Sequence, residues 1–342
     1  MKAAVLREFG KPLFLEEVET PQPGADEVLI RVMASGIDGT DLKLIEGFGY
    51  RPDLPFVIGH EPAGVVHEIG SAVKDFKEGD RVVTYNFTTC GNCLLCRTNR
   101  EQLCPNMTGI LGARGRPGGH AEFLNMPARQ VVEIPDAISF ADAAVLCDAG
   151  ITALHAVDRA GLRLGETVAI FGVGGVGSYA VQFAKLAGAR VIAVDVTDAK
   201  TDRAIELGAD EAINSSHRDA VREIHLLTEG WGVDCVIDIV GKEATIGAGV
   251  NALRNGGRIV IVGYTPEEYR VNGKHIAQNE LQVIGTRCGC KQDLINTVRL
   301  VAEGRTKSIV TDQLPLDQIN EALSKLRARE VLGRLVLQVA EP

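Results

Sequence analysis

The chain of 342 residues is long enough for two domains, and its apolar fraction of 45 % is enough for real cores. Its formal net charge of −9 argues against nucleic acid or an anionic membrane as the main partner, because both require a basic face. No apolar run approaches the ~20 residues of a membrane helix, and the start "MKAAVLREFG" lacks the apolar core of a signal peptide. We therefore expect a soluble cytoplasmic protein.

The first third of the chain is predicted to form short strands. Its segments are rich in Val, Ile and Leu and are separated by Gly and Pro turns such as "PQPGADE". This pattern indicates a β-rich, barrel-like domain. The expected strands lie at residues 2–8, 13–18, 27–37, 62–70 and 79–85.

A cluster of four cysteines follows these strands. Cys90, Cys93, Cys96 and Cys104 have the spacing C-x2-C-x2-C-x7-C, and in a reducing compartment such clustering indicates metal more than disulfides. Four thiolates on one short loop can close a tetrahedral zinc site with no open position, so we predict a structural zinc. An iron–sulfur cluster is the alternative, since cysteines spaced by two residues also occur there.

The character of the chain changes near residue 150. From residue 166 to 195 the sequence gives a strand, a Gly-rich turn, a helix and a second strand. Continuous apolar strands that alternate with helices indicate a parallel sheet covered on both faces. The later elements are a helix over 197–210, strands at 233–241, 257–264 and 281–286, and helices with a final strand over 291–304 and 316–339.

The Gly-rich turn has the form GxGxxG, formed by Gly172, Gly174 and Gly177 between a strand and a helix. The first Gly allows the tight turn, the second lets a pyrophosphate approach the backbone, and the third lets helix and strand pack closely. The alternative is a turn that only permits packing. The predicted cofactor-binding residues of this turn are Gly172, Gly174, Gly175, Val176 and Gly177.

Asp195 closes the second strand 18 residues after Gly177. Its carboxylate would accept hydrogen bonds from the adenosine ribose hydroxyls and repel a 2′-phosphate. No Arg follows it in "DVTDAK". We therefore predict NAD rather than NADP as the cofactor.

Several motifs occur in an order and spacing that resembles the zinc-dependent medium-chain alcohol and polyol dehydrogenases over essentially the whole chain. They are "GIDGTD", "GHEPAGVV", the cysteine cluster, "GGHAEF", "DAGITALHA" and "GVGGVG". The resemblance implies an α/β fold with a GroES-like catalytic barrel (1–149), a Rossmann NAD-binding domain (150–285) and a C-terminal segment (286–342) that returns to the first domain. It also implies reversible hydride transfer between a small-molecule alcohol or carbonyl and a nicotinamide, in a homodimer or homotetramer.

The resemblance assigns the catalytic zinc ligands residue by residue. The first ligand, a Cys in most of the family, falls on Asp38, the second on His60, and the third on Asp148; Glu61 follows His60 and can swing onto the metal. Cys147 is one residue out of register and would point elsewhere from an extended backbone, although it is an alternative ligand. A second alternative is that Asp38 is only a turn residue.

A ligand set without sulfur has consequences for the metal. Oxygen ligands hold zinc less tightly than thiolates and admit harder metals such as Mn more readily. Three carboxylates and a neutral His leave surplus negative charge, which weakens the Lewis acid unless a cation compensates. We name Arg287 as that candidate cation.

The resemblance also assigns the proton path and further cofactor contacts. Thr40 occupies the relay position two residues after Asp38, and Lys43 stands where many members have a His. Lys43 ends the relay, holds cofactor or substrate, or is simply a solvated lysine. Thr152 and Lys291 are predicted to contact the cofactor, Lys291 at its pyrophosphate.

The substrate pocket is predicted to be polar. Asn86 and Arg287 fall where alcohol-oxidising members tend to have aromatics, Arg114 and Arg116 lie in a loop that would approach the cleft, and His120 replaces a frequent Tyr or Phe. Such a pocket suits a hydroxyl-rich or anionic substrate, because a planar guanidinium can bind a carboxylate through two hydrogen bonds. The alternative is that these arginines bind cofactor phosphate or face water.

The prediction is thus an NAD-dependent zinc dehydrogenase of a polyol, sugar or sugar acid. The alternatives are an alcohol dehydrogenase of broad specificity for primary and secondary alcohols, and a dinucleotide-binding protein without a catalytic metal. A zinc-free quinone reductase of the same superfamily fits poorly, because such chains usually lack both the cysteine cluster and "GHE".

Overall fold

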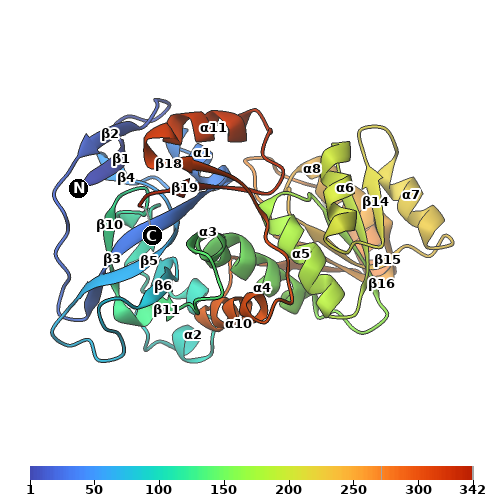
Figure 1. Cartoon of the computed structure of the whole chain (residues 1–342). Coiled ribbons are helices and arrows are strands. Elements are labelled where there is room, and N and C mark those ends of the chain that lie inside the picture. Colours follow the sequence, from blue (N-terminus) through green and yellow to red (C-terminus); the bar gives the residue numbers. More distant parts are fainter. Residues whose placement is uncertain (271, 341–342) are drawn as a thin grey trace. The chain divides into compact units, whose positions relative to one another are not determined.

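The computed structural model describes residues 1–270 and 272–340 and divides into two compact units (Figure 1). Unit 1 comprises Met1–Gly150 together with Cys290–Pro342, and unit 2 comprises Ile151–Gly289. The end of the chain therefore belongs to the same unit as its beginning. The division falls one and four residues after the domain starts expected at residues 150 and 286.

The largest sheet of unit 1 is antiparallel except for its last pair of strands, with the order β11-β6-β5-β3-β19-β18 and with β10 also paired to β3. Val28, Ile30 and Val32 of β3 pack with Val66 and Val82 in its core. These strands are β3 (Glu27–Ile37), β5 (Glu61–Ile69), β6 (Arg81–Thr84), β10 (Phe123–Pro127), β11 (Val131–Glu133), β18 (Val310–Pro315) and β19 (Arg334–Gln338). The sequence pattern does not predict β18.

The register of this sheet brings distant residues to one edge. Gly36 pairs with Glu61 of β5, and Ile37 pairs with Leu335 of β19. Gly36 needs to be glycine, because a Cβ there would lie 2.0 Å from Oε2 of Glu61. The end of β3 and the beginnings of β5 and β19 therefore lie side by side.

The remaining elements of unit 1 are two small sheets and several helices. One sheet has the order β2-β1-β4, and the other has the order β7-β8-β9. The strands are β1 (Lys2–Leu6), β2 (Phe14–Glu17), β4 (Phe56–Val57), β7 (Phe87–Thr88), β8 (Gly109–Leu111) and β9 (Gly115–Arg116). The helices are α1 (Gly39–Ile45), α2 (Leu94–Arg97), α3 (Phe140–Val145), the π-helical turn η3 (Leu146–Gly150), α10 (Lys291–Ala302) and α11 (Ile319–Arg327), with short 3-10 turns η1 (Glu101–Leu103), η2 (Ala128–Gln130) and η4 (Leu316–Gln318).

Unit 2 is a parallel six-stranded sheet with helices, as the alternating pattern predicts (Figure 1). Its order β14-β13-β12-β15-β16-β17 is the 3-2-1-4-5-6 order of a doubly wound Rossmann sheet. The strands are β12 (Thr167–Phe171), β13 (Arg190–Asp195), β14 (Glu211–Asn214), β15 (Val233–Asp238), β16 (Leu253–Ile261) and β17 (Gln282–Gly285). The helices are α4 (Ile151–Ala160), α5 (Gly175–Leu186), α6 (Asp198–Glu206), α7 (Ala220–Leu227), α8 (Glu243–Ala252) and α9 (Gly273–Gln278).

The segments α3, η3 and α4 follow one another without a gap and form the helical stretch Phe140–Ala160. By length and composition alone this stretch could cross a membrane, but 67 % of its most apolar window is buried inside the protein. Its sequence also contains three aspartates and an arginine. A largely buried helix of this kind is typical of a protein core.

Candidate functional site

Four side chains of unit 1 converge in a cluster that could hold a metal ion. Each of Asp38, His60, Glu61 and Asp148 offers one ligand atom, and these atoms all lie within 4.8 Å of one another. Asp38 directly follows β3, His60 and Glu61 lie at the start of β5, and Asp148 lies in η3. The structure therefore brings together the four residues that the resemblance predicts.

Asp38 has a structural role in addition to its place in the cluster. It is the N-cap of α1: Oδ1 accepts the backbone N–H of Thr40 at 2.7 Å, and the side chain of Asp41 accepts the N–H of Asp38 at 3.0 Å. The same carboxylate faces His60, with Oδ1 3.7 Å from Nε2. The cap fixes the orientation of Asp38. Asp38 can therefore act as a turn residue and as a metal ligand at the same time.

His60 has the surroundings that a metal ligand requires. Its ring is buried, and Nε2 faces Oδ1 of Asp38 at 3.7 Å and Oδ1 of Asp148 at 3.9 Å. Among the described residues, neither ring nitrogen has a hydrogen-bond partner. A buried polar atom without a partner is costly. Two carboxylates and an imidazole suit a divalent cation such as zinc, so the residues present fit a metal.

A buried arginine completes the cluster. Arg334, the first residue of β19, is 6 % exposed. One terminal nitrogen of its guanidinium lies 2.8 Å from Glu61 and 3.0 Å from Asp148, and the other lies 3.5 Å from Asp38. The cation in contact with the surplus carboxylates is therefore Arg334, which the sequence analysis did not name.

The pKa directions follow from burial and from this arginine. Burial of Asp38 disfavours its charge, but His60, Arg334 and the Thr40 N–H together lower its pKa. Burial raises the pKa of Glu61 well above its usual value, and Arg334 opposes that rise only in part. Asp38 is therefore suited to remain an anionic ligand, while Glu61 is the carboxyl group that most readily takes a proton.

Cys147, the alternative ligand, does not belong to the clustered group, although its sulfur lies 3.6 Å from the carbonyl oxygen of His60. The backbone of η3 is helical, not extended. The Cys147 thiol is fully buried and donates to the carbonyl of Ala144 at 3.1 Å. The amide nitrogen of Asn86, predicted to face substrate, donates to the carbonyl of Cys147 at 3.1 Å. Asn86 thus holds the backbone next to Asp148, and its Oδ1 has no partner among the described residues.

Two other residues predicted for the substrate pocket have different surroundings. His120 is fully buried, and Arg116 forms an ion pair with Glu27 at 2.9 Å. The expectation for His120 is wrong, because its two ring nitrogens face Ser35 and Asp41 inside unit 1, and the contact of Arg116 with substrate stays a prediction. Arg114 and Arg287 are exposed, and their contact with substrate stays a prediction.

The four clustered cysteines form a second, separate metal-binding group. The sulfur–sulfur distances are 3.9 Å for Cys90–Cys96, 3.5 Å for Cys93–Cys96, 3.9 Å for Cys93–Cys104 and 3.5 Å for Cys90–Cys104. None of the four is in a disulfide. A tetrahedral zinc with bonds of 2.3 Å would space its sulfurs by about 3.8 Å, so this cysteine lobe (residues 90–104) fits zinc.

Backbone groups prepare the cysteine lobe for a cation. The N–H groups of Asn92 and Cys93 lower the pKa of Cys90 to about 6. The guanidinium of Arg129 donates to the carbonyls of Thr89 and Cys90 and thereby holds the start of the loop. The lobe is therefore ordered by main-chain contacts as well as by its thiols.

The Gly-rich turn of unit 2 has the expected geometry. Gly172 has a φ of 91°, Gly174 is the N-cap of α5, and a Cβ on Gly177 would lie 1.9 Å from the carbonyl oxygen of Gly172. Oδ2 of Asp195 accepts the Val173 N–H at 2.7 Å, which ties the acidic residue to the turn. Further lone pairs of this carboxylate remain for ribose hydroxyls.

The two other predicted cofactor contacts differ in their surroundings. Thr152 is buried in α4. Lys291 belongs to unit 1, where Nζ donates to the carbonyl of Arg129 at 2.8 Å and the backbone N–H donates to Glu101. Their contact with the cofactor stays a prediction.

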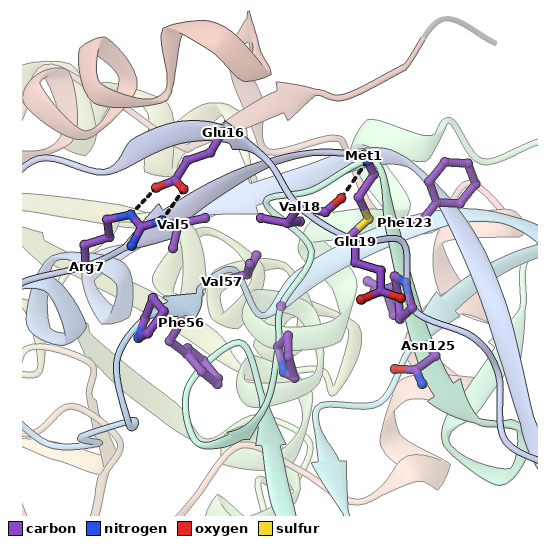
Figure 2. A pocket seen from close by; sticks show the side chains of 15 residues that line it. Met1, Val5, Arg7, Glu16, Val18, Glu19, Phe56, Val57, Phe123 and Asn125 are labelled. Atoms are coloured by element: carbon purple, nitrogen blue, oxygen red, sulfur yellow. Dashed lines mark hydrogen bonds and ion pairs between the residues drawn. The ribbon is translucent and has the colours of Figure 1, made fainter.

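A cavity of about 260 Å³ lies elsewhere in unit 1 (Figure 2). Val5, Phe56 and Phe123 contribute to its apolar wall, and Arg7 pairs with Glu16 at its side. None of the predicted metal ligands lines it. This cavity is therefore distinct from the metal cluster.

Unit 2 has a Rossmann sheet, and the β-rich unit 1 holds the cysteine lobe and the oxygen-rich cluster formed by Asp38, His60, Glu61 and Asp148. This is the arrangement of a zinc-dependent dehydrogenase. The family model for zinc-binding dehydrogenases matches residues 175–303, and the model for the alcohol dehydrogenase GroES-like domain matches residues 24–136. The chain belongs to the zinc-dependent medium-chain alcohol dehydrogenase family.

Individual relatives cover the whole chain. An alcohol dehydrogenase of Geobacillus stearothermophilus is 38 % identical, over 99 % of this chain and 100 % of the relative. An NAD-dependent alcohol dehydrogenase of Saccharolobus solfataricus is 35 % identical, over 98 % and 99 %. The crystal structure of the alcohol dehydrogenase from Aeropyrum pernix superposes with a TM-score of 0.93 at 38 % identity, over 99 % of this chain and 100 % of the other.

Proposed function

We propose that this chain is an NAD-dependent zinc dehydrogenase that moves hydride between NAD and the hydroxyl-bearing carbon of a polar alcohol, such as a polyol, sugar or sugar acid. The observation that carries the proposal is His60, whose buried and unpartnered Nε2 faces Asp38 and Asp148. Asp38, His60 and Asp148 would hold the zinc, with Glu61 in reserve. Bound zinc supplies a Lewis acid for the alcohol oxygen, and NAD accepts the hydride.

The proton of the alcohol needs an acceptor beside the cluster. The Thr40 hydroxyl donates to Oδ2 of Asp38 at 3.2 Å, which leaves its oxygen able to accept a hydrogen bond from the alcohol while Asp38 stays anionic. Lys43, half-buried on the same helix, lies near enough to Asp38 and Asp148 for both to act on its charge. Burial lowers the pKa of Lys43 although these carboxylates oppose it, so the neutral amine, which could accept the proton of the alcohol, forms more readily than in an exposed lysine.

Two polar groups support a hydroxyl-rich substrate. Oδ1 of Asn86 is buried without a partner among the described residues, and the amide nitrogen is already engaged at Cys147. A hydroxyl group could donate to that oxygen, which an alkyl chain cannot. Lys43 adds a hydrogen-bond donor at the cluster.

Metal content tests the catalytic metal. The parent should hold two zinc ions per chain, and Asp38→Ser should hold one, because serine keeps the helix cap but removes the carboxylate. Asp219→Ser is the matched control: it makes the same change at the N-cap of α7, outside both metal clusters, and should keep two. One zinc in parent and variant alike would contradict the proposal and favour a dinucleotide-binding protein without a catalytic metal.

Turnover with matched substrates tests the specificity. Polyols and sugar acids should give kcat/KM values at least about tenfold above those of alkyl alcohols of the same length, because the Asn86 oxygen stays unpaired with the latter. Asn86→Leu should reduce that ratio. A preference for alkyl alcohols would instead favour an alcohol dehydrogenase of broad specificity.

A further inference from the structure

A buried chain of polar side chains lies behind His60. Oγ of Ser35 is 2.9 Å from Nδ1 of His120, Nε2 of His120 is 3.5 Å from Oδ1 of Asp41, and the same oxygen is 3.9 Å from Nδ1 of His60. Ser35, His120 and Asp41 are each 0 % exposed. The chain therefore runs from the interior of unit 1 to the predicted metal ligand without contact with solvent.

The three inner atoms of this chain have no other partners among the described residues. Oδ1 of Asp41, Nε2 of His120 and Nδ1 of His60 all lack a hydrogen bond elsewhere. An unpaired polar atom in the core is costly. The two imidazole nitrogens face the carboxylate oxygen at 3.5 and 3.9 Å, longer than a hydrogen bond, and a carboxylate oxygen can accept from two imidazole N–H groups once these contacts shorten.

This arrangement favours one set of hydrogen positions. Oδ1 of Asp41 faces both imidazoles, and it attracts an N–H at Nε2 of His120 and at Nδ1 of His60. For a neutral His120, Nδ1 then accepts from the Ser35 hydroxyl. For His60, Nε2 is left with a lone pair, and this is the nitrogen that faces Asp38 and Asp148. The buried chain therefore presents His60 in the form that can bind a metal.

Asp41 controls both sides of the cluster. Its Oδ2 accepts the backbone N–H of Asp38 at 3.0 Å, while its Oδ1 faces His60 and His120. A tilt of this carboxylate would move a contact of two predicted ligands, Asp38 and His60. Besides His60, the side chain that faces Oδ1 of Asp41 is His120.

The backbone is built to place the His120 ring there. Gly59 has a φ of 103°, and a Cβ on it would lie 2.5 Å from Nδ1 of His120. The N–H of His120 donates to the carbonyl of Ile58, and its carbonyl accepts from Ala4 at 2.8 Å. The ring thus packs against Gly59, directly before His60, while the backbone of His120 is held by Ile58.

We propose that His120 is a positioning residue that, through Asp41, holds His60 in its metal-binding orientation and raises the affinity of the oxygen-rich cluster for zinc. The proposal rests on the proposed function, because it takes His60 as a ligand. It concerns affinity and orientation, and His120 itself touches neither metal nor substrate.

Two substitutions at one position separate positioning from packing. In His120→Gln the amide nitrogen takes the place of Nε2 and can still donate to Asp41, whereas in His120→Asn the shorter amide reaches only the Ser35 side. The dissociation constant of zinc is measured on the full chain by competition with a chromophoric chelator. We expect His120→Asn to bind the second zinc about 10- to 100-fold more weakly and His120→Gln to stay within about threefold of the parent.

The outcomes are distinct. Equal and parent-like affinity in both variants overturns the proposal, and equal weakening in both assigns His120 to packing and overturns it as well. The zinc of the cysteine lobe serves as an internal control for folding. Should His120→Asn fail to fold, Ser35→Ala decides: an affinity about fivefold lower supports the relay, and an unchanged affinity overturns it. A parent chain that takes up only one zinc refutes the proposed function itself, and this proposal falls with it.

Discussion

The two metal-binding groups of unit 1 are built in opposite ways. The cysteine lobe takes all four sulfurs from residues 90–104. The contacts that hold this loop are its own thiols and the hydrogen bond from Arg129 to the carbonyl of Cys90. The oxygen-rich cluster takes its ligands from positions 38, 60, 61 and 148, which lie at the end of β3, at the start of β5 and in η3. A local site can be recognised from spacing, whereas a dispersed one depends on the register of the sheet that assembles it.

The two groups also balance charge differently. In the lobe, four thiolates would bind zinc directly and outweigh its charge, but Cys90, Cys93 and Cys96 are only part-buried, so water can screen the surplus. In the cluster, three carboxylates share Arg334 before any metal arrives. The cluster is therefore an ion network in which a metal and an arginine share the same carboxylates, and it should be the more sensitive of the two to mutation.

The largest effect is expected from removal of that arginine. Arg334→Met leaves Asp38, Glu61 and Asp148 without their buried cation, and breaking a buried ion pair costs about 3–5 kcal/mol. The free energy of unfolding of metal-free protein, measured in urea, should fall by that amount. Excess zinc should restore part of the loss, since it binds only the folded cluster.

Arg7→Met is the matched control for this change. The Arg7–Glu16 pair is more exposed, and water screens such a pair, so its loss should change the free energy of unfolding far less than the loss of Arg334. If Arg334→Met lowered the free energy of unfolding as little as Arg7→Met, the three carboxylates would not depend on the arginine. The cluster would then need no supporting cation, and the difference in charge balance between the two metal groups would disappear.

A smaller effect is expected when the cluster is made more like the lobe. Asp38→Cys replaces an oxygen ligand with sulfur and should tighten zinc binding by about 10-fold, with a matching loss of affinity for Mn. The variant also loses the helix cap, which costs about 1 kcal/mol of stability. Metal competition titrations measure the first effect and thermal unfolding the second.

Asp38→Asn provides the comparison for that variant. Asparagine keeps the helix cap but offers a neutral oxygen. The variant should therefore keep the thermal stability of the parent and lose the zinc of the oxygen-rich cluster. If Asp38→Cys bound zinc no better than Asp38→Asn, residue 38 would not be a ligand.

The contrast between the groups also explains what could be predicted from sequence. The spacing of Cys90 to Cys104 and the Gly-rich turn after β12 contain their own geometry, and both are present in the structure. Arg334 meets Asp38 only because β19, near the end of the chain, pairs with β3, near its beginning. No pattern near residue 334 indicates that pairing, apart from a charged residue at the start of an otherwise apolar strand.

His120 shows the same limit from the other side. The motif "GGHAEF" aligns His120 with a position where related dehydrogenases often have a Tyr or Phe. This alignment predicts that His120 is a pocket residue. Its true direction depends on Gly59, whose missing side chain makes room for the ring behind His60. Side-chain direction of this kind is decided by packing between segments 60 residues apart and not by local sequence.

The smallest effect is expected at the brace of the cysteine lobe. Arg129→Ala removes the donor to the carbonyls of Thr89 and Cys90, and a hydrogen bond of this kind contributes about 1 kcal/mol. Because four thiolates define the zinc geometry, the zinc content should stay unchanged while the thiols react faster with a disulfide reagent once zinc is chelated. Arg100→Ala, at an exposed arginine of the same loop, is the control and should leave that rate unchanged. If Arg129→Ala instead lost zinc, the lobe would depend on a supporting charge as the oxygen-rich cluster does, and the distinction between a self-contained and a supported metal group would fail.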